Sequence, residues 1–236
     1  MIKTVLFDLD GTLLRMDQDA FIKLYFQGLA THMSPYGYDP NALIKAIWEG
    51  TGAMVSNKGE TTNEAVFWSV LKAKLGEHVS DDLAHFEEFY QEGFEKARAA
   101  CGEVKGVRAL IDRLHQNGIR TVLATNPIFP EIATNARIRW AGLTRNDFAL
   151  ITVYENSRHC KPNLDYYRDI LQELNLDPTE CCMVGNDVDE DMIAHKLGMQ
   201  VFLLTDCLLN RNGADISQYP HGDITALEVF LNAQLS

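Results

Sequence analysis

The sequence predicts an α/β protein in which a doubly wound parallel sheet carries an inserted all-helical domain. After about Gly102, short apolar and β-branched runs alternate with helical segments. Repeated β-α-β units of this kind form parallel sheets with helices on both faces. Between residues 16 and 100, strand-like runs are absent and apolar residues recur at helical spacing. We therefore expect a core of residues 1–15 and 101–236, with a helical domain of residues 16–100 inserted after the first strand.

The first strand is predicted at residues 3–7 and leads directly into Asp8-Leu9-Asp10-Gly11-Thr12. Side chains alternate along a strand, so Asp8 and Asp10 leave on the same side if the extended geometry persists. Neighbouring carboxylates repel each other and are costly to desolvate, which favours a nearby cation or a catalytic role. Asp and Gly are also favoured turn residues, so the pattern alone leaves both interpretations open.

The predicted helices of the insertion share apolar residues at three- and four-residue spacing. They are expected around Phe21 to Leu29, at 41–48, at 63–75, and from an N-cap at residues 80–82 through Phe94. The stretch 50–60 is polar and contains glycine, and it is either a substrate-specificity loop or an ordinary connection between helices. Asn57 and Lys58 are its candidate contact residues.

The second part of the chain alternates strands and helices. Strands are predicted at 119–124, 148–153, 181–184 and 200–204, and helices at 107–114, 130–140, 162–174, 189–197 and 224–231. Residues 206–222 are expected to be irregular.

Composition excludes several classes of partner. The formal charge of −12 disfavours nonspecific binding to nucleic acid or to an anionic membrane. No apolar run approaches the roughly 20 residues that span a bilayer, and the start of the chain does not look like a signal peptide. The five cysteines form no Cys-x-x-Cys pair, which fits a reduced, cytoplasmic protein. The sequence does not indicate the oligomeric state.

Polar residues follow the predicted strands, where ligands bind in doubly wound sheets. These residues are Asp8 and Asp10, Thr125 and Asn126, Lys161, and Asn186, Asp187 and Asp191. Such a set suits phosphoryl transfer, which depends on positioning and on stabilising charge. One Asp can act as nucleophile, a neighbouring carboxyl as general acid and base, and oxygen ligands as a Mg²⁺ site.

Four stretches in order resemble the four motifs of the haloacid dehalogenase-like superfamily of phosphohydrolases. Residues 8–13 match Asp-x-Asp-Gly-Thr, and residues 123–126 match a strand that ends in Thr or Ser. Lys161-Pro162 matches the third motif, and residues 184–191 match the acidic fourth. The helical insertion resembles the C1 cap of that superfamily, and the core its Rossmann-like sheet.

The resemblance implies a role for each residue of the first three motifs. Asp8 would be the nucleophile, and Asp10 the general acid and base. Thr125 would hydrogen-bond the transferring phosphoryl group, assisted by the backbone amide of Asn126. Lys161 would neutralise Asp8 and the phosphoryl oxygens.

The resemblance also implies Mg²⁺, held by Asp8, by the main-chain carbonyl of Asp10 and by the fourth motif. That motif departs from the commoner Gly-Asp start and reads Gly-Asn-Asp. Asp187 is the preferred ligand. Asn186 stands where many relatives carry the first Asp, and its amide oxygen is an alternative. Asp191 is either a ligand or lies behind one.

The predicted function is that of a magnesium-dependent phosphatase acting on a small phosphorylated metabolite. A phosphomutase needs the same residues and remains an alternative, as does a non-catalytic binding protein on the same fold. A dehalogenase is disfavoured because Asp10 supplies an acid that a halide leaving group does not need. Simpler interpretations also stand: Thr125 as an N-cap, Lys161 as a solvated lysine, and His159 as structural.

Overall fold

The computed structural model describes residues 1–235, and its centre is a parallel sheet. Within these residues the main sheet has five strands in the order β4-β1-β5-β6-β7, and every neighbouring pair is parallel. The strands are β1 (Thr4–Phe7), β4 (Arg120–Leu123), β5 (Cys181–Gly185), β6 (Gln200–Leu204) and β7 (His221–Gly222). Parallel neighbours must be joined by crossover connections, and those before β6 contain helices. The predicted α/β fold is therefore confirmed.

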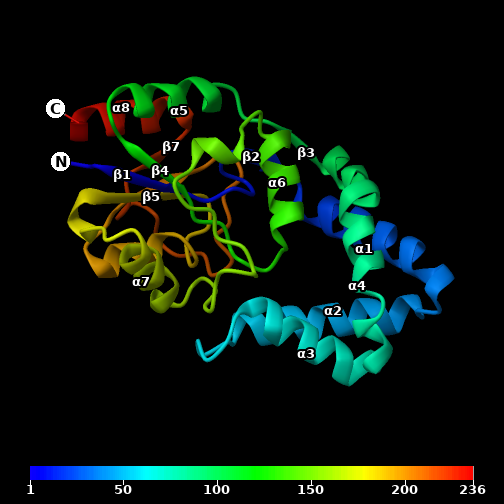
Figure 1. Ribbon diagram of the computed structural model, residues 1–236. Coiled ribbons are helices and arrows are strands. Elements are labelled where there is room, and N and C mark those ends of the chain that lie inside the picture. Colours follow the sequence, from blue (N-terminus) through cyan, green and yellow to red (C-terminus); the bar gives the residue numbers. More distant parts are fainter. Residues whose placement is uncertain (236) are drawn as a thin grey trace.

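Helices cover both faces of this sheet (Figure 1). Alternate residues of β1 face opposite ways: Val5 and Phe7 join one hydrophobic cluster, and Leu6 joins the other. The first cluster includes side chains of α5 (Val107–Gln116) and α8 (Ile224–Leu235), and the second includes side chains of α7 (Leu164–Glu173). The sheet is therefore doubly wound, as the alternating pattern predicts.

A helical insertion, here residues 17–100, leaves and re-enters the core through two short antiparallel strands. These strands are β2 (Leu14–Met16) and β3 (Cys101–Glu103). The helices of the insertion are α1 (Gln18–Met33), α2 (Pro40–Val55), α3 (Asn63–Leu75) and α4 (Leu83–Glu88). Side chains of Asp17, Asp39 and Thr62 cap the first three helices. The helix α6 (Glu131–Trp140) lies between the core and the insertion (Figure 1).

Three predicted elements differ from the structure. The helix expected through Phe94 changes after α4 to a π-helical turn at 89–93 and then to a 3-10 helix. The helix expected at 189–197 is a turn followed by a 3-10 helix at Met192–Leu197. The strand expected at 148–153 is a single bridge between Leu123 and Ile151.

The side chain of Asn156 explains why this strand stops. Its amide nitrogen donates to the carbonyl of Ile151 and its oxygen accepts from the amide of Val153. A side chain that takes backbone groups in this way replaces the partners that a longer ladder would need.

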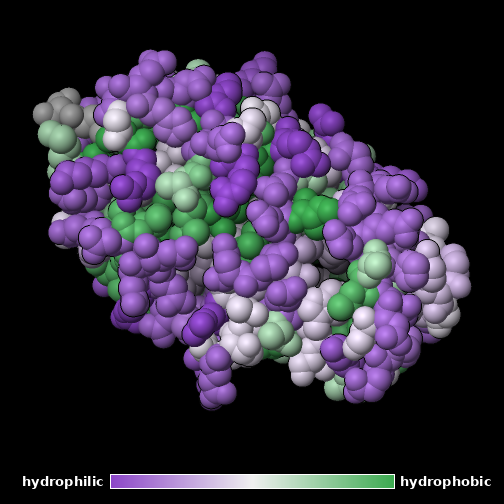
Figure 2. Space-filling model, in the orientation of Figure 1, coloured by the Kyte–Doolittle hydropathy of each residue, from purple (hydrophilic) through white to green (hydrophobic). Residues whose placement is uncertain are grey.

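Polar residues dominate the face of the molecule shown in Figure 2, and a band of hydrophobic residues crosses the core. All five cysteines are free, and Cys160, Cys181 and Cys182 are buried. Among residues 1–235, no helix has both the length and the apolar character needed to cross a membrane.

Candidate active site

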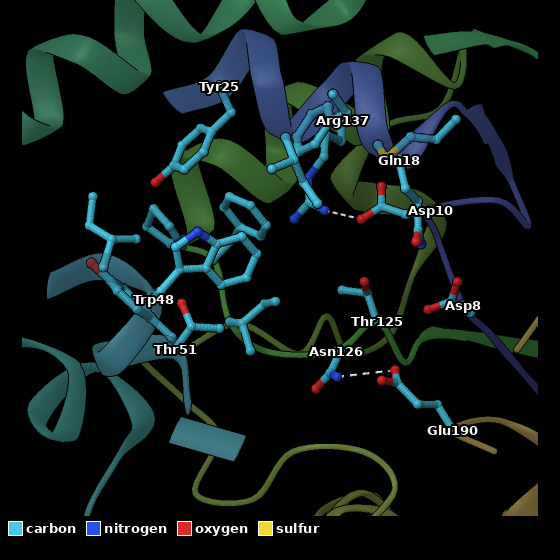
Figure 3. A pocket seen from close by; sticks show the side chains of 18 of the residues that line it. Asp8, Asp10, Gln18, Tyr25, Trp48, Thr51, Thr125, Asn126, Arg137 and Glu190 are labelled. Carbon is cyan, nitrogen blue, oxygen red and sulfur yellow. Dashed lines mark hydrogen bonds and ion pairs between the residues drawn. The ribbon is translucent and has the colours of Figure 1, made fainter. Parts of the chain in front are cut away.

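The predicted site residues meet at the carboxyl ends of the central strands. Asp8 follows β1, Thr125 and Asn126 follow β4, and Asp187 follows β5. These four residues and Asp10 line one cavity of about 260 Å³ between the sheet and the helical insertion (Figure 3). The prediction that they gather at one edge of the sheet is confirmed.

Lys161 joins two of the predicted carboxylates inside the protein. Its Nζ lies 3.0 Å from Oδ1 of Asp8 and 2.6 Å from Oδ1 of Asp191. The side chains of Lys161 and Asp191 are each 1% exposed. Burial opposes the charge on Lys161, but the carboxylates of Asp191 and Asp8 outweigh it and raise the pKa of Lys161 well above its usual value. Lys161 is therefore a buried ammonium group and not a solvated loop lysine.

Arg137 holds Asp10, and the sequence reasoning did not find this contact. Its NH1 donates to Oδ2 of Asp10, and its NH2 donates to Thr134 Oγ1 at 3.2 Å. The guanidinium carbon lies 4.5 Å from the ring centroid of Phe129. Burial raises the pKa of Asp10, and Arg137 acts in the opposite direction. The two neighbouring carboxyls therefore have different partners: Lys161 for Asp8 and Arg137 for Asp10.

A signal for Arg137 was present in the sequence. It lies four residues after Ala133, on the apolar face of its helix, and it is 1% exposed. A charged residue on a buried helical face needs a partner of opposite charge, which directs attention to the nearby acids.

Glu190 is a second residue that the sequence reasoning missed. Its Oε2 accepts a hydrogen bond of 3.1 Å from the side chain of Asn126. Burial raises the pKa of Glu190 to about 7. The same Asn126 side chain accepts from the backbone amide of Lys161 through its Oδ1, at 3.2 Å. Asn126 thus links the loops that carry Lys161 and Glu190.

The carboxylate of Asp187 organises the turn after β5. Its Oδ1 accepts from the amides of Asp189 and Glu190 at 2.9 and 3.0 Å. Its Oδ2 accepts from Arg211 NH1 at 2.5 Å. These bonds explain why the chain turns here before the 3-10 helix. Asp191 Oδ2 accepts from the amide of Asp187 at 3.0 Å, so both acids stabilise the same turn.

The hydroxyl of Thr12 connects the amide oxygen of Asn186 to the predicted nucleophile. The Thr12 hydroxyl is 3.0 Å from Oδ1 of Asn186 and 3.3 Å from Oδ2 of Asp8. Gly11 has a φ of +88°, which favours glycine, and its lack of a side chain makes room for Asn186, since an added Cβ would lie 2.3 Å from Nδ2 of Asn186.

The site contains oxygen donors of the kind that Mg²⁺ prefers, among them the Asp8 carboxylate and the Asn186 amide oxygen, which both accept from the Thr12 hydroxyl. In the described part of the chain, no three His, Cys, Asp or Glu side chains are grouped so that they could hold a metal ion. Mg²⁺ uses few protein oxygens and keeps several waters, and an amide oxygen beside one carboxylate supplies such a set. The prediction that Asp187 is a metal ligand stays untested.

The polar stretch 50–60 is helix in its first half and a connection between helices in its second. Its first half belongs to α2, from which Thr51 lines the cavity. Asn57 instead donates to Oδ1 of Asn63 at 2.9 Å, and Lys58 is exposed. His159 pairs with Asp169 at 2.7 Å, which supports its structural interpretation.

Comparisons with known proteins agree with this architecture. A family model described as haloacid dehalogenase-like hydrolase matches residues 2–197. No curated protein matches the chain.

Solved structures share its fold at low sequence identity. A 2-haloacid dehalogenase from Pseudomonas syringae pv. Tomato is 19% identical with a TM-score of 0.66, covering 99% of this chain and 100% of that one. A predicted phosphoglycolate phosphatase from Haemophilus somnus is 16% identical with a TM-score of 0.59, covering 98% of both chains. The putative hydrolase YfnB from Bacillus subtilis, bound to magnesium, is 19% identical with a TM-score of 0.57, covering 98% of this chain and 99% of that one.

These likenesses establish the fold, and the family model covers most of the chain. The matched residues 2–197 include Asp8, Thr125, Lys161 and the acidic turn after β5. The structure places all of them at the carboxyl edge of the parallel sheet. The chain belongs to the haloacid dehalogenase-like hydrolases.

Proposed function

We propose that the protein is a magnesium-dependent phosphatase that hydrolyses a small phosphorylated metabolite through an aspartyl phosphate on Asp8. The observation that carries this proposal is the contrast between two neighbouring carboxyls. Asp8 pairs with the buried ammonium of Lys161, whereas burial raises the pKa of Asp10 despite the opposing effect of the Arg137 guanidinium. A nucleophile and a proton donor two residues apart need such different environments.

In the first step, a carboxylate oxygen of Asp8 attacks the phosphorus of the substrate. The bond from phosphorus to the alcohol oxygen breaks, and the leaving oxygen takes the proton of Asp10. Lys161 balances the charge on Asp8, and the Thr125 hydroxyl lies in the cavity beside it, where it would donate to a phosphoryl oxygen.

In the second step, Asp10 accepts a proton from water, and the water oxygen attacks the phosphorus of the aspartyl phosphate. The bond from phosphorus to Asp8 breaks, which releases inorganic phosphate and restores the carboxylate. The proton remaining on Asp10 is the one needed for the next turnover.

The oxygens proposed to hold Mg²⁺ are the Asp8 carboxylate, the main-chain carbonyl of Asp10 and an oxygen of the fourth motif. Asp187 is the choice from the sequence, and Asn186 is the choice from the geometry. When bound, the ion neutralises negative charge on the phosphoryl oxygens. We also propose that the helical insertion is the cap domain over this site.

Phosphate release from acetyl phosphate, which is intrinsically reactive and small, tests this function directly. We expect release with Mg²⁺, loss of release with excess EDTA, and recovery when Mg²⁺ is restored. Asp8→Asn should abolish release while the circular dichroism spectrum stays unchanged. Retained turnover in Asp8→Asn would remove the nucleophile assignment, and turnover that EDTA leaves intact would remove the metal.

A further inference from the structure

The cavity continues from the catalytic carboxylates into the helical insertion, where aromatic rings form its walls. Figure 3 shows Asp8, Thr125 and Glu190 at one side and Tyr25, Trp48 and Thr51 at the other. Rings from the insertion that line the cavity belong to Phe21, Tyr25, Phe26, Trp48, Phe67, Trp68, Phe86 and Tyr90. The space beside the reacting atoms is therefore enclosed by rings.

The charges of this cavity all lie at its catalytic end. Among the described lining residues, every charged side chain comes from the core and none from the insertion. Both arginines are already paired, Arg137 with Asp10 and Arg211 with Asp187. A substrate whose leaving group carries a carboxylate or a second phosphate would find no cation there. Burying such a charge without a partner is costly.

Polar groups in the aromatic part are few, and the main ones satisfy each other. The hydroxyls of Tyr25 and Tyr90 lie 2.9 Å apart and share a hydrogen bond. Gln18, Thr51 and the indole N–H groups of Trp48 and Trp68 are the other neutral polar groups that the insertion contributes to the walls. A sugar with several hydroxyls would lose more hydrogen bonds to water than these few groups replace.

Apolar rings suit the same space. Burial of apolar surface is favourable, and aromatic rings add edge-to-face and offset-stacked contacts with other rings. The walls already show such geometry: Phe67 and Trp68 meet at 77° with ring centroids 5.2 Å apart. The cavity of about 260 Å³ has room for a phosphoryl group together with a small leaving group.

We propose that the substrate is a phosphate monoester of an uncharged, apolar alcohol that carries an aromatic ring. This inference rests on the phosphatase function proposed above, with the phosphoryl group at Asp8 and the ring among Tyr25, Trp48 and their neighbours.

The test compares three alkyl phosphates whose alcohols differ in polarity and charge. The esters are 2-phenylethyl phosphate, glycerol phosphate and phosphoglycolate. An alkyl ester with a ring is preferred to a nitrophenyl ester, because a good leaving group would raise the rate without any pocket. We expect kcat/KM for 2-phenylethyl phosphate to exceed that for glycerol phosphate roughly 100-fold, with phosphoglycolate the poorest. Equal or reversed values would overturn the proposal.

A matched pair of variants on α2 connects this preference to the cavity. Trp48 lines the cavity and is 51% exposed, whereas Val55 is 43% exposed and does not line it. Trp48→Ala should lower the ratio of kcat/KM for the phenylethyl ester to that for glycerol phosphate about fivefold. Val55→Ala should leave this ratio unchanged. An unchanged ratio in Trp48→Ala would place the ring elsewhere and contradict the proposal.

Hydrolysis of acetyl phosphate distinguishes a wrong substrate class from a wrong enzymatic function. If it is hydrolysed in a manner that needs Asp8, while the phenylethyl ester is no better than glycerol phosphate, the substrate class is wrong and the phosphatase stands. If none of the phosphate esters nor acetyl phosphate is hydrolysed, the proposed function itself fails.

Discussion

Lys161 and Asp191 form an ion pair of 2.6 Å between two side chains that are each 1% exposed. The second oxygen of Asp191 accepts from the amide of Asp187. Gly185 makes room for it, because an added Cβ there would lie 2.0 Å from Oδ2 of Asp191. The pair therefore fixes the position of the ammonium group that faces Asp8.

Breaking this pair from either side should destabilise the fold. Lys161→Met leaves the buried carboxylate of Asp191 without its cation, whereas Asp191→Asn leaves the ammonium of Lys161 with Asp8 as its carboxylate partner. We expect Lys161→Met to lower the free energy of unfolding by about 3–5 kcal/mol and Asp191→Asn by less. The double variant should lose less than the sum of the two. Urea denaturation measures all three values.

An exposed ion pair on α7 provides the control. Arg168 and Asp165 lie 2.7 Å apart at 56% and 50% exposure. Arg168→Met should change the free energy of unfolding by less than about 1 kcal/mol. A loss from Lys161→Met no greater than this would show that burial does not strengthen the pair.

Arg137 is a positioning residue for Asp10. Arg137→Lys keeps the charge but loses the fork that joins Asp10 to Thr134, so the carboxyl is held less accurately. We expect kcat to fall roughly 10- to 100-fold, with KM changed less than about twofold. Arg139→Lys, an exposed position on the same helix, is the matched control. A large rise in KM with kcat intact would show that Arg137 binds substrate.

Asn63 fastens the helical insertion to the core. Its side chain is fully buried, and its Nδ2 lies 3.2 Å from the carbonyl of Pro127 and 3.3 Å from Sγ of Cys160. Asn63→Ala should cost about 1–3 kcal/mol of unfolding free energy, since it leaves partners unsatisfied. The nearby amide of Glu64, which bonds to the carbonyl of Tyr154, should exchange its hydrogen faster.

Lys58→Ala alters an exposed residue of the connection between α2 and α3. It should leave both the free energy of unfolding and the hydrogen exchange at Glu64 unchanged. Equal exchange rates at Glu64 in wild type and Asn63→Ala would mean that the backbone contacts alone hold the insertion in place.

The two candidate ligands of the fourth motif predict different responses to Mg²⁺. Binding to the folded state raises the melting temperature by an amount that grows with the logarithm of affinity, so a thermal shift reports binding without activity. Because the oxygens of Asn186 and Asp8 contact the same Thr12 hydroxyl, we expect Asn186→Ala to abolish most of the Mg²⁺-dependent shift. Asp187→Asn should retain a measurable shift. The reverse order would support Asp187, which the sequence motif favours.

The alternation of strands and helices was sufficient to predict the sheet because each buried strand is a short apolar run. Residues 200–204 are such a run, and the structure has β6 at the predicted residues. The strands β2, β3 and β7 have two or three residues each, which is too short for a period to be visible. The bridge at Ile151 shows the opposite error, because a single Asn side chain ends a strand that its apolar residues favour.

The site was predictable for the residues that directly follow strands, and it was missed for Arg137 on α6 and for Glu190 further along the turn after β5. Asp8, Thr125 and Asn126 follow predicted strands, so topology alone brings them together. Arg137 comes from the middle of a helix, and its contact with Asp10 depends on how α6 packs. Local sequence contains no information on that packing. Likewise, the motif named the acids after β5, but only the structure shows that Asp187 is engaged by its own turn.

The hydrogen bond between Tyr25 and Tyr90 has a consequence for selectivity. Two hydroxyls that bond to each other do not penalise a ring for a missing polar group, so among uncharged ring-bearing esters this pocket discriminates mainly by shape. Such pockets separate ligands that differ by one methylene by only about 10- to 200-fold. The protein should therefore accept a family of related ring-bearing phosphates, and a single preferred compound should stand out by its abundance in the cell more than by its fit.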